Sequence, residues 1–120
     1  MPFDPNLSPE TAEIIRVLRK ARNLIDTVGW CQGTYTRGKS GRSVDPNGRF
    51  VAAFCASGAI HHLIREFGFG KGVGNARNAL SDACYGGIIS YNDTPGRTKE
   101  EVLAVFDQTI INLVEKEHAI

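Results

Sequence analysis

Two short segments hold most of the polar side chains that could do chemistry in this sequence. The first segment, residues 30–37, follows the first long stretch of regularly spaced apolar residues. The second precedes the last such stretch and reads Tyr91-Asn92-Asp93-Thr94-Pro95-Gly96-Arg97-Thr98. Asp93 and Arg97 could face a ligand together, or they could pair across a turn in a purely structural role. The candidate binding residues of the two segments are Trp30, Gln32, Tyr35, Arg37, Tyr91, Asn92, Asp93 and Arg97.

Cysteine and histidine could supply nucleophilic catalysis or metal binding. Cys55 and His62 are separated on an expected helix by two turns, about 10.5 Å, which is too far for a direct nucleophile–base hydrogen bond. Cys31, Cys55 and Cys84 lack the paired spacing of structural zinc sites. We therefore expect buried free thiols, no metal and no cofactor, and we assign no catalytic residue.

Two further segments resemble ligand-binding motifs. The glycine-rich segment 68–75 looks like a phosphate loop, yet it follows an expected helix, and neither Ser nor Thr follows Lys71. A basic hairpin over residues 35–49 could bind nucleic acid weakly through Arg37, Lys39, Arg42 and Arg49. The formal net charge of +1 argues against a dedicated nucleic-acid binder.

The first helix must position the earlier polar segment. Apolar residues at intervals of three and four run from Ile14 to Val28, and Ser8-Pro9 suits the start of a helix. Gly29 predicts a left-handed end, with Trp30 packed back onto the helix.

The middle of the chain predicts shorter elements. We expect the hairpin over 31–49, a second helix over about 51–67 and a stop at Gly68, after which Phe69 packs back. A flexible glycine loop, a third helix from about Ala76 and a turn at 88–91 follow. Thr98 and Glu101 form a capping box that begins the last helix.

The whole pattern predicts a mainly α fold, a compact bundle of about four helices with a minor β-hairpin. Residues 1–120 fit a single domain, with a lead-in at 1–8 and a fraying tail at 115–120. If the first and last helices pack antiparallel, segments 30–37 and 91–97 meet at one pole. The sequence has neither a membrane-length apolar run nor the pattern of a signal peptide, so we expect a cytoplasmic protein.

Three motifs in order resemble those of a known family. They are Gly29-Trp30-Cys31-Gln32-Gly33, Phe54-Cys55-Ala56-Ser57-Gly58-Ala59-Ile60 and the 91–98 segment. The sequence is similar to a group of small bacterial and phage proteins catalogued as a domain of unknown function, over roughly residues 12–114. Tyr91 stands where that family often has Trp. The resemblance implies a shared fold and supplies no activity.

We expect a non-enzymatic binding or accessory protein that acts through the face carrying the hairpin and the 92–97 turn. Its partner would be another protein or a second copy of itself, not a membrane or nucleic acid. One alternative is a small enzyme, which would bring Asp93, Arg97 and a thiol or histidine into one concave pocket. Another is weak nucleic-acid binding through the hairpin.

Overall fold

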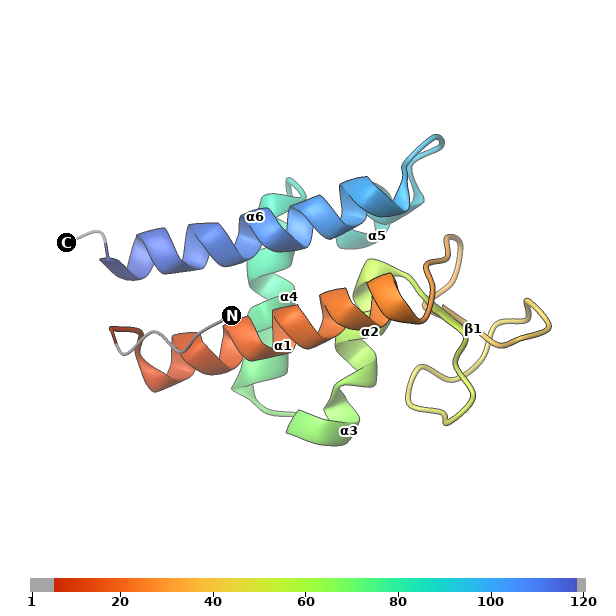
Figure 1. Cartoon of the computed structure of the whole chain (residues 1–120), viewed down its shortest axis with the longest axis horizontal. Coiled ribbons are helices and arrows are strands. Elements are labelled where there is room, and N and C mark those ends of the chain that lie inside the picture. The colour runs from red at the N-terminus through yellow and green to blue at the C-terminus, as the bar shows by residue number, and fades with distance from the viewer. Residues whose placement is uncertain (1–5, 119–120) are drawn as a thin grey trace.

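Three long helices frame the computed structural model, which describes residues 6–118: α1 (Pro9–Thr27), α4 (Lys71–Ala83) and α6 (Lys99–His118). Figure 1 shows α1 and α6 side by side and antiparallel, with α4 crossing both. The backbone N–H of Ser8 donates to Glu117 at one end of this pair (2.6 Å), and Lys99 Nζ donates to the carbonyl of Asp26 at the other (2.9 Å). The antiparallel packing expected from the sequence is therefore confirmed.

Helix α1 begins as predicted but ends differently. The Ser8 hydroxyl accepts a hydrogen bond from the backbone N–H of Thr11 (3.2 Å), and proline follows at the first helical position. Gly29 is not left-handed, because the helix closes through a right-handed Val28. A Cβ at Gly29 would lie 2.6 Å from the carbonyl oxygen of Ala52, so glycine is needed here for close approach of another segment.

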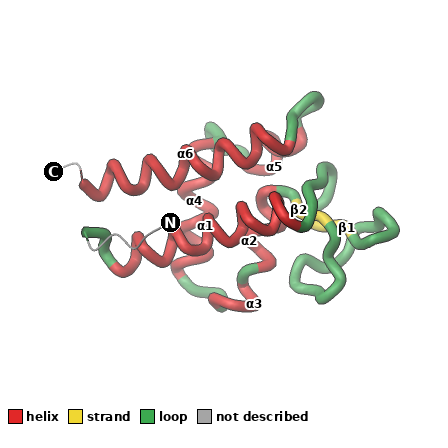
Figure 2. The backbone as a smooth tube through the Cα atoms, in the orientation of Figure 1, coloured by secondary structure: helices red, strands yellow, loops and turns green. Residues whose placement is uncertain are grey.

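A two-stranded antiparallel sheet lies at the end of the molecule where α1 ends (Figure 2). Its strands are β1 (Thr36–Arg37) and β2 (Ala53–Phe54). The predicted return strand at 42–44 makes only a single bridge, from Arg37 to Ser43. The predicted hairpin is therefore reduced to this one bridge. The longer pairing of β1 is with β2, over residues that the sequence predicted to be helical.

The predicted helix over 51–67 is wrong at its start and is divided in two. Residues 51–55 are extended because their backbone bonds to the β1 region, with Ala52 N donating to Arg37 O (2.7 Å) and Cys55 N to Tyr35 O (2.9 Å). The helical part is α2 (Ala56–His62) followed by the short α3 (Ile64–Phe67).

The remaining boundaries also shift. Gly68 ends α3 with a φ of 76°, as predicted, but Phe69 is 88% exposed and does not pack back. Helix α4 includes Gly72 and Gly74, which the sequence placed in a flexible loop. Residues 88–93 form a helix, α5 (Ile88–Asp93), instead of a turn. The mainly helical fold with a minor sheet is confirmed.

The apolar core lies where α1, α2, α4 and α6 meet. Its largest completely buried apolar side chains come from these helices and from β2, and they are Val17, Leu18, Ile25, Phe54, Ile60, Leu80, Val102 and Phe106. Glu101 accepts from the backbone N–H of Thr98 (2.9 Å), which confirms the capping box at the start of α6. The helices within residues 6–118 include none with the length and apolar character that a bilayer span requires.

Residues 1–5 of the expected lead-in and residues 119–120 of the expected tail lie outside the described residues. Helix α6 continues through residues 115–118.

Candidate functional site

Asn92 connects the two polar segments from a fully buried position on α5. Its Oδ1 accepts hydrogen bonds from Trp30 Nε1 (2.8 Å) and from the backbone N–H of Ala56 (3.0 Å). Its Nδ2 donates to the carbonyl of Cys31 (3.1 Å) and to the carboxylate of Asp93 (2.9 Å). Every hydrogen-bonding position of the amide is used, so Asn92 fixes three segments to one another and has no capacity left for a ligand.

Gln32 and Asp93 complete this connection. Gln32 Nε2 donates to the backbone carbonyls of Asn92 (2.9 Å) and Thr94 (3.2 Å), and the backbone N–H of Gly33 donates to Asp93 Oδ1 (3.1 Å). The expectation that segments 30–37 and 91–97 meet at one pole is confirmed.

Arg37 supports its own loop. Its two terminal nitrogens donate to the carbonyls of Gln32 (2.8 Å) and Gly41 (2.9 Å). The guanidinium therefore holds the ends of the 32–41 segment together and is not free to face a ligand.

Arg97 turns away from Asp93. Its Nε donates to the carbonyl of Tyr91 (2.8 Å), and its guanidinium carbon lies 3.7 Å from the centre of the Tyr91 ring. Its ion pair is with Glu101 at 3.5 Å. Tyr91 and Arg97 thus form a stacked pair that fixes the turn before α6. Of the two alternatives considered for Asp93 and Arg97, the structure of residues 6–118 shows neither an ion pair between them nor both in one pocket.

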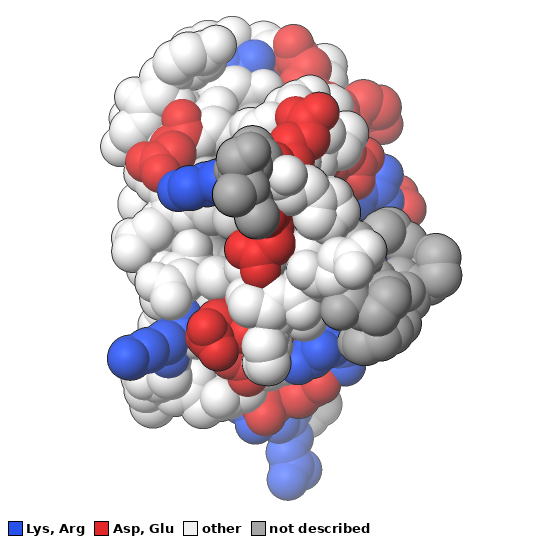
Figure 3. All heavy atoms as spheres, turned by 90° about the vertical axis from the view of Figure 1, so that its left-hand side faces the viewer, with Lys and Arg blue, Asp and Glu red and all other residues white. Residues whose placement is uncertain are grey.

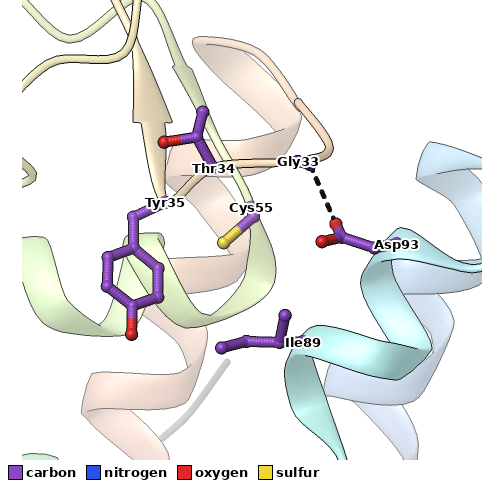
Figure 4. Close-up of a pocket in the computed structure, with 6 residues that line it drawn as sticks. All are labelled: Gly33, Thr34, Tyr35, Cys55, Ile89 and Asp93. Carbon is purple, nitrogen blue, oxygen red and sulfur yellow. Dashed lines mark hydrogen bonds between the residues drawn. The ribbon is translucent and has the colours of Figure 1, made fainter.

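A pocket of about 270 Å³ opens beside this network, between segment 33–35 and α5. Figure 4 shows the thiol of Cys55 pointing into the space between Tyr35 and Ile89, with Asp93 on another side. We call this the Asp93 pocket, and its lining residues are Gly33, Thr34, Tyr35, Cys55, Ile89 and Asp93. Its wall combines apolar and aromatic surface with a single charged group.

The carboxylate of Asp93 has one oxygen available. Oδ1 accepts from the backbone N–H of Gly33 and from the side chain of Asn92, whereas Oδ2 accepts no hydrogen bond from any residue in 6–118. A carboxylate fixed through one oxygen presents the other in a defined direction, which suits an ammonium, guanidinium or amide donor.

The thiol of Cys55 lacks the activation that a nucleophile needs. Burial raises the pKa of Cys55. Hydrogen bonds from the backbone N–H groups of Gly58 and Ser57 oppose part of this rise, and the negative charge of Asp93 adds a smaller increase. A raised pKa keeps the thiol protonated at neutral pH, and the thiolate is the nucleophilic form.

Neither histidine of α2 supplies a base to this thiol. His62 Nδ1 bonds to the carbonyl of Pro46 at 2.5 Å, and the His61 ring stacks on Tyr35 with a centroid distance of 6.1 Å. Over residues 6–118, Cys, His, Asp and Glu side chains form no group of three that could hold a metal ion.

Of the candidate residues from the sequence, Tyr35 and Asp93 line the pocket. The others make contacts within the protein that hold the segments around the pocket in place. Sequence reasoning missed Gly33, Thr34 and Ile89. Ile89 is 46% exposed on a short helix, and a large apolar residue with that exposure is a candidate contact surface. That exposure appears only once the position of α5 is known.

Comparison with known families adds one assignment. A family model described as "Family of unknown function (DUF6197)" matches residues 9–112. The chain belongs to this family. No curated protein and no solved structure matches the chain. This match confirms the resemblance to a family of unknown function that the three sequence motifs suggested. The description of the family names no activity.

Proposed function

We propose that this protein is a non-enzymatic binding protein that holds a basic side chain of another polypeptide in the Asp93 pocket. The main support for this proposal is the arrangement of Asp93, whose carboxylate is fixed through Oδ1 and presents a free Oδ2 beside apolar surface. Tyr35 and Ile89 can cover the aliphatic part of a lysine or arginine, and the carboxylate can bind its charged end.

The rim of the pocket favours a macromolecular partner. Tyr35 and Ile89 are 41% and 46% exposed, and exposed aromatic and apolar side chains beside fixed polar groups are typical of protein-binding surfaces. A second copy of the chain offers the same chemistry and is the alternative partner. A cytoplasmic location stays a prediction.

The pocket supports binding better than catalysis. Arg97 is absent from the pocket lining, and the Cys55 thiol is held protonated by burial. An acyl or group-transfer enzyme needs a nucleophile and a base in hydrogen-bond reach, and the pocket offers one carboxylate without such a pair.

Nucleic-acid binding has less support. Both terminal nitrogens of Arg37 donate to backbone carbonyls, which leaves the predicted basic hairpin with one fewer side chain free to bind a phosphate. Figure 3 shows the end of the molecule where α1 begins and α6 ends, opposite the hairpin, and on the described surface visible at this end acidic and basic side chains are interspersed, so this end offers no positive face. A binder of phosphate backbones gathers positive charge on one face.

A titration followed by NMR tests the proposal. We expect N-acetyl-lysine amide to shift the amide resonances of Gly33, Thr34 and Asp93 in a saturable way, and N-acetyl-norleucine amide, which lacks the ammonium, to bind at least about tenfold more weakly. Asp93→Asn keeps the shape and should remove the preference for lysine. The matched control is Asp107→Asn, which should not.

Equal binding of the two probes, or no saturable shift with either, would contradict the proposed function. Retention of the lysine preference by Asp93→Asn would contradict the assignment of the site.

A further inference from the structure

A second cavity shares Ile89 with the Asp93 pocket as a lining residue. It has a volume of about 270 Å³, and we call it the Arg77 cavity. Its walls come from α4, α5 and the turn between them, and its lining residues are Arg77, Asn78, Ser81, Gly86, Gly87, Ile88, Ile89 and Ser90. Ile89 belongs to both cavities, so the two are neighbours on one surface. Arg77 is the charged residue among these eight, and none of them is acidic.

Arg77 differs from the cations of the long helices that pair with carboxylates. Lys20 pairs with Glu66, and Arg22 pairs with Asp107. Arg77 is half-buried and forms no ion pair within residues 6–118. A partly desolvated cation without a counter-charge is unfavourable, and an anion in the cavity would offset this cost.

The guanidinium is anchored but not saturated. One terminal nitrogen, Nη1, donates to the hydroxyl of Ser57, which is itself completely buried. The remaining N–H groups of Arg77 donate to no group in the described part of the chain. One fixed nitrogen sets the direction of the planar fork, and the other donors stay available to a ligand.

Three polar side chains around Arg77 are also available. Asn78, Ser81 and Ser90 line the cavity, and their side chains make no hydrogen bond to any residue in 6–118. Together they supply an amide and two hydroxyls beside one guanidinium. A carboxylate has a single negative charge and a planar pair of oxygens, which matches one guanidinium. A phosphate monoester carries about 1.5 to 2 negative charges at neutral pH and would be only partly neutralised here.

We infer that the Arg77 cavity is a carboxylate subsite for the same polypeptide that places a basic side chain in the Asp93 pocket. This inference rests on the proposed function. Ile89 then separates two recognition points of opposite charge, and the bound segment carries a cation and a carboxylate on either side of an apolar contact.

The test uses four probes at constant pH and ionic strength, followed by NMR. N-acetyl-aspartate amide carries a side-chain carboxylate, N-acetylglycinate carries a terminal carboxylate, N-acetyl-asparagine amide is the neutral control, and inorganic phosphate is the competing anion. We expect at least one carboxylate probe to shift the amides of Ser81, Ile89 and Ser90 and to bind at least about tenfold more tightly than the neutral control. The tighter carboxylate identifies the source of the group.

Variants separate the two sites. Arg77→Gln should remove the carboxylate preference, and Arg65→Gln, an exposed arginine outside the cavity, should leave it unchanged. Asp93→Asn should keep the carboxylate preference while it removes the preference for lysine over norleucine. Ser90→Asp is a second test variant, because it adds a negative charge to the cavity wall without removing the hydrogen bond from Arg77 to Ser57. It should abolish carboxylate binding even if Arg77→Gln does not fold.

Binding of phosphate without binding of either carboxylate would overturn the inference. So would equal binding of N-acetyl-asparagine amide, or carboxylate binding that survives Ser90→Asp. Failure of the carboxylate probes while the lysine probe still binds would overturn the subsite and leave the proposed function standing.

Discussion

Asn92 is the residue on which the candidate site depends most. Its amide is completely buried and satisfies an indole, two backbone groups and a carboxylate at once. Polar groups buried in this way are costly to leave unpaired, so such a side chain specifies one arrangement of the segments it joins.

Asn92→Ala should lower the free energy of unfolding by about 3–5 kcal/mol, because Trp30 Nε1, Ala56 N and the Cys31 carbonyl lose their partner together. Urea unfolding followed by circular dichroism measures the change. Asn112→Ala, on the exposed side of α6, is the matched control and should change stability by less than about 0.5 kcal/mol. Similar losses in both variants would contradict the role given to Asn92.

The buried thiol of Cys84 predicts an alkaline loss of stability. Burial raises its pKa from 9.0 to about 11, and the positive charge of Arg97 opposes part of this shift. The unfolded chain releases the thiol proton at lower pH than the folded protein does, so the stabilising contribution is complete below about pH 9 and is lost as the pH rises toward 11.

Thermal unfolding of wild type and Cys84→Ala between pH 8 and 11.5 tests this expectation. The variant should be less stable than wild type at pH 8 by about 1 kcal/mol, and the difference should shrink and then reverse in sign as the pH rises toward 11. Other groups titrate in both proteins and cancel in the comparison. A difference that is independent of pH would show that the thiol titrates alike in the folded and unfolded chains.

At the scale of elements, glycines set how closely α2 approaches β1. A Cβ on Gly58 would lie 2.0 Å from the carbonyl oxygen of Tyr35, the residue before β1, and this backbone oxygen is held by a hydrogen bond from the N–H of Cys55. Gly74 on α4 is the opposite case, because nothing lies within 4 Å of the position that a Cβ would take there. The two positions offer the same substitution with opposite surroundings.

Gly58→Ala should destabilise the protein by about 3 kcal/mol or more through overpacking, and it should broaden the NMR signals of segment 33–37. Gly74→Ala should stabilise the protein by about 0.5–1 kcal/mol, because alanine favours a helix. Chemical denaturation measures both effects. Tolerance of alanine at residue 58 would mean that α2 and β1 are not packed as described.

The sequence predicted where a helix begins when the residues that cap the helix are its close neighbours in the sequence. Ser8-Pro9 and the Thr98–Glu101 box are examples, because each cap uses residues within one turn of the helix it begins. The start of α2 could not be predicted in this way. Residues 51–55 are extended because their backbone bonds to segment 35–37, and nothing in the small side chains of 51–55 shows that partner.

The candidate site was predicted in the same partial way. Polar composition pointed to segments 30–37 and 91–97, and the antiparallel helices bring them together. Which side chains face a ligand depends on tertiary hydrogen bonds, so Asn92 and Arg37 are used internally while Asp93 keeps one oxygen free. Ile89 and Arg77 gained significance only from the packing of α5 against α4.

At the scale of the whole molecule, a bidentate ion pair joins the outer sides of α1 and α6. Arg22 donates through Nε and Nη2 to the two carboxylate oxygens of Asp107, at 2.7 and 3.1 Å. The two side chains are 28% and 48% exposed, so solvent screens much of the attraction.

A double-mutant cycle of Arg22→Gln and Asp107→Asn should give a coupling energy of no more than about 1 kcal/mol, and it should decrease in 1 M salt. Equilibrium unfolding of the four proteins supplies the cycle. A coupling above about 2 kcal/mol, or one insensitive to salt, would mean that the pair is far less hydrated than its exposure indicates.

The contact between Ser8 and Glu117 has a consequence for protein engineering. Figure 1 shows the start of α1 and the end of α6 at the end of the molecule opposite β1, so a short glycine–serine bridge between residues 6 and 118 would close the backbone into a ring away from segment 33–35 of the Asp93 pocket. New termini could then be opened at 68–70, where Phe69 is exposed. Such a circular permutant would present a fluorescent reporter on a different side of the same binding surface.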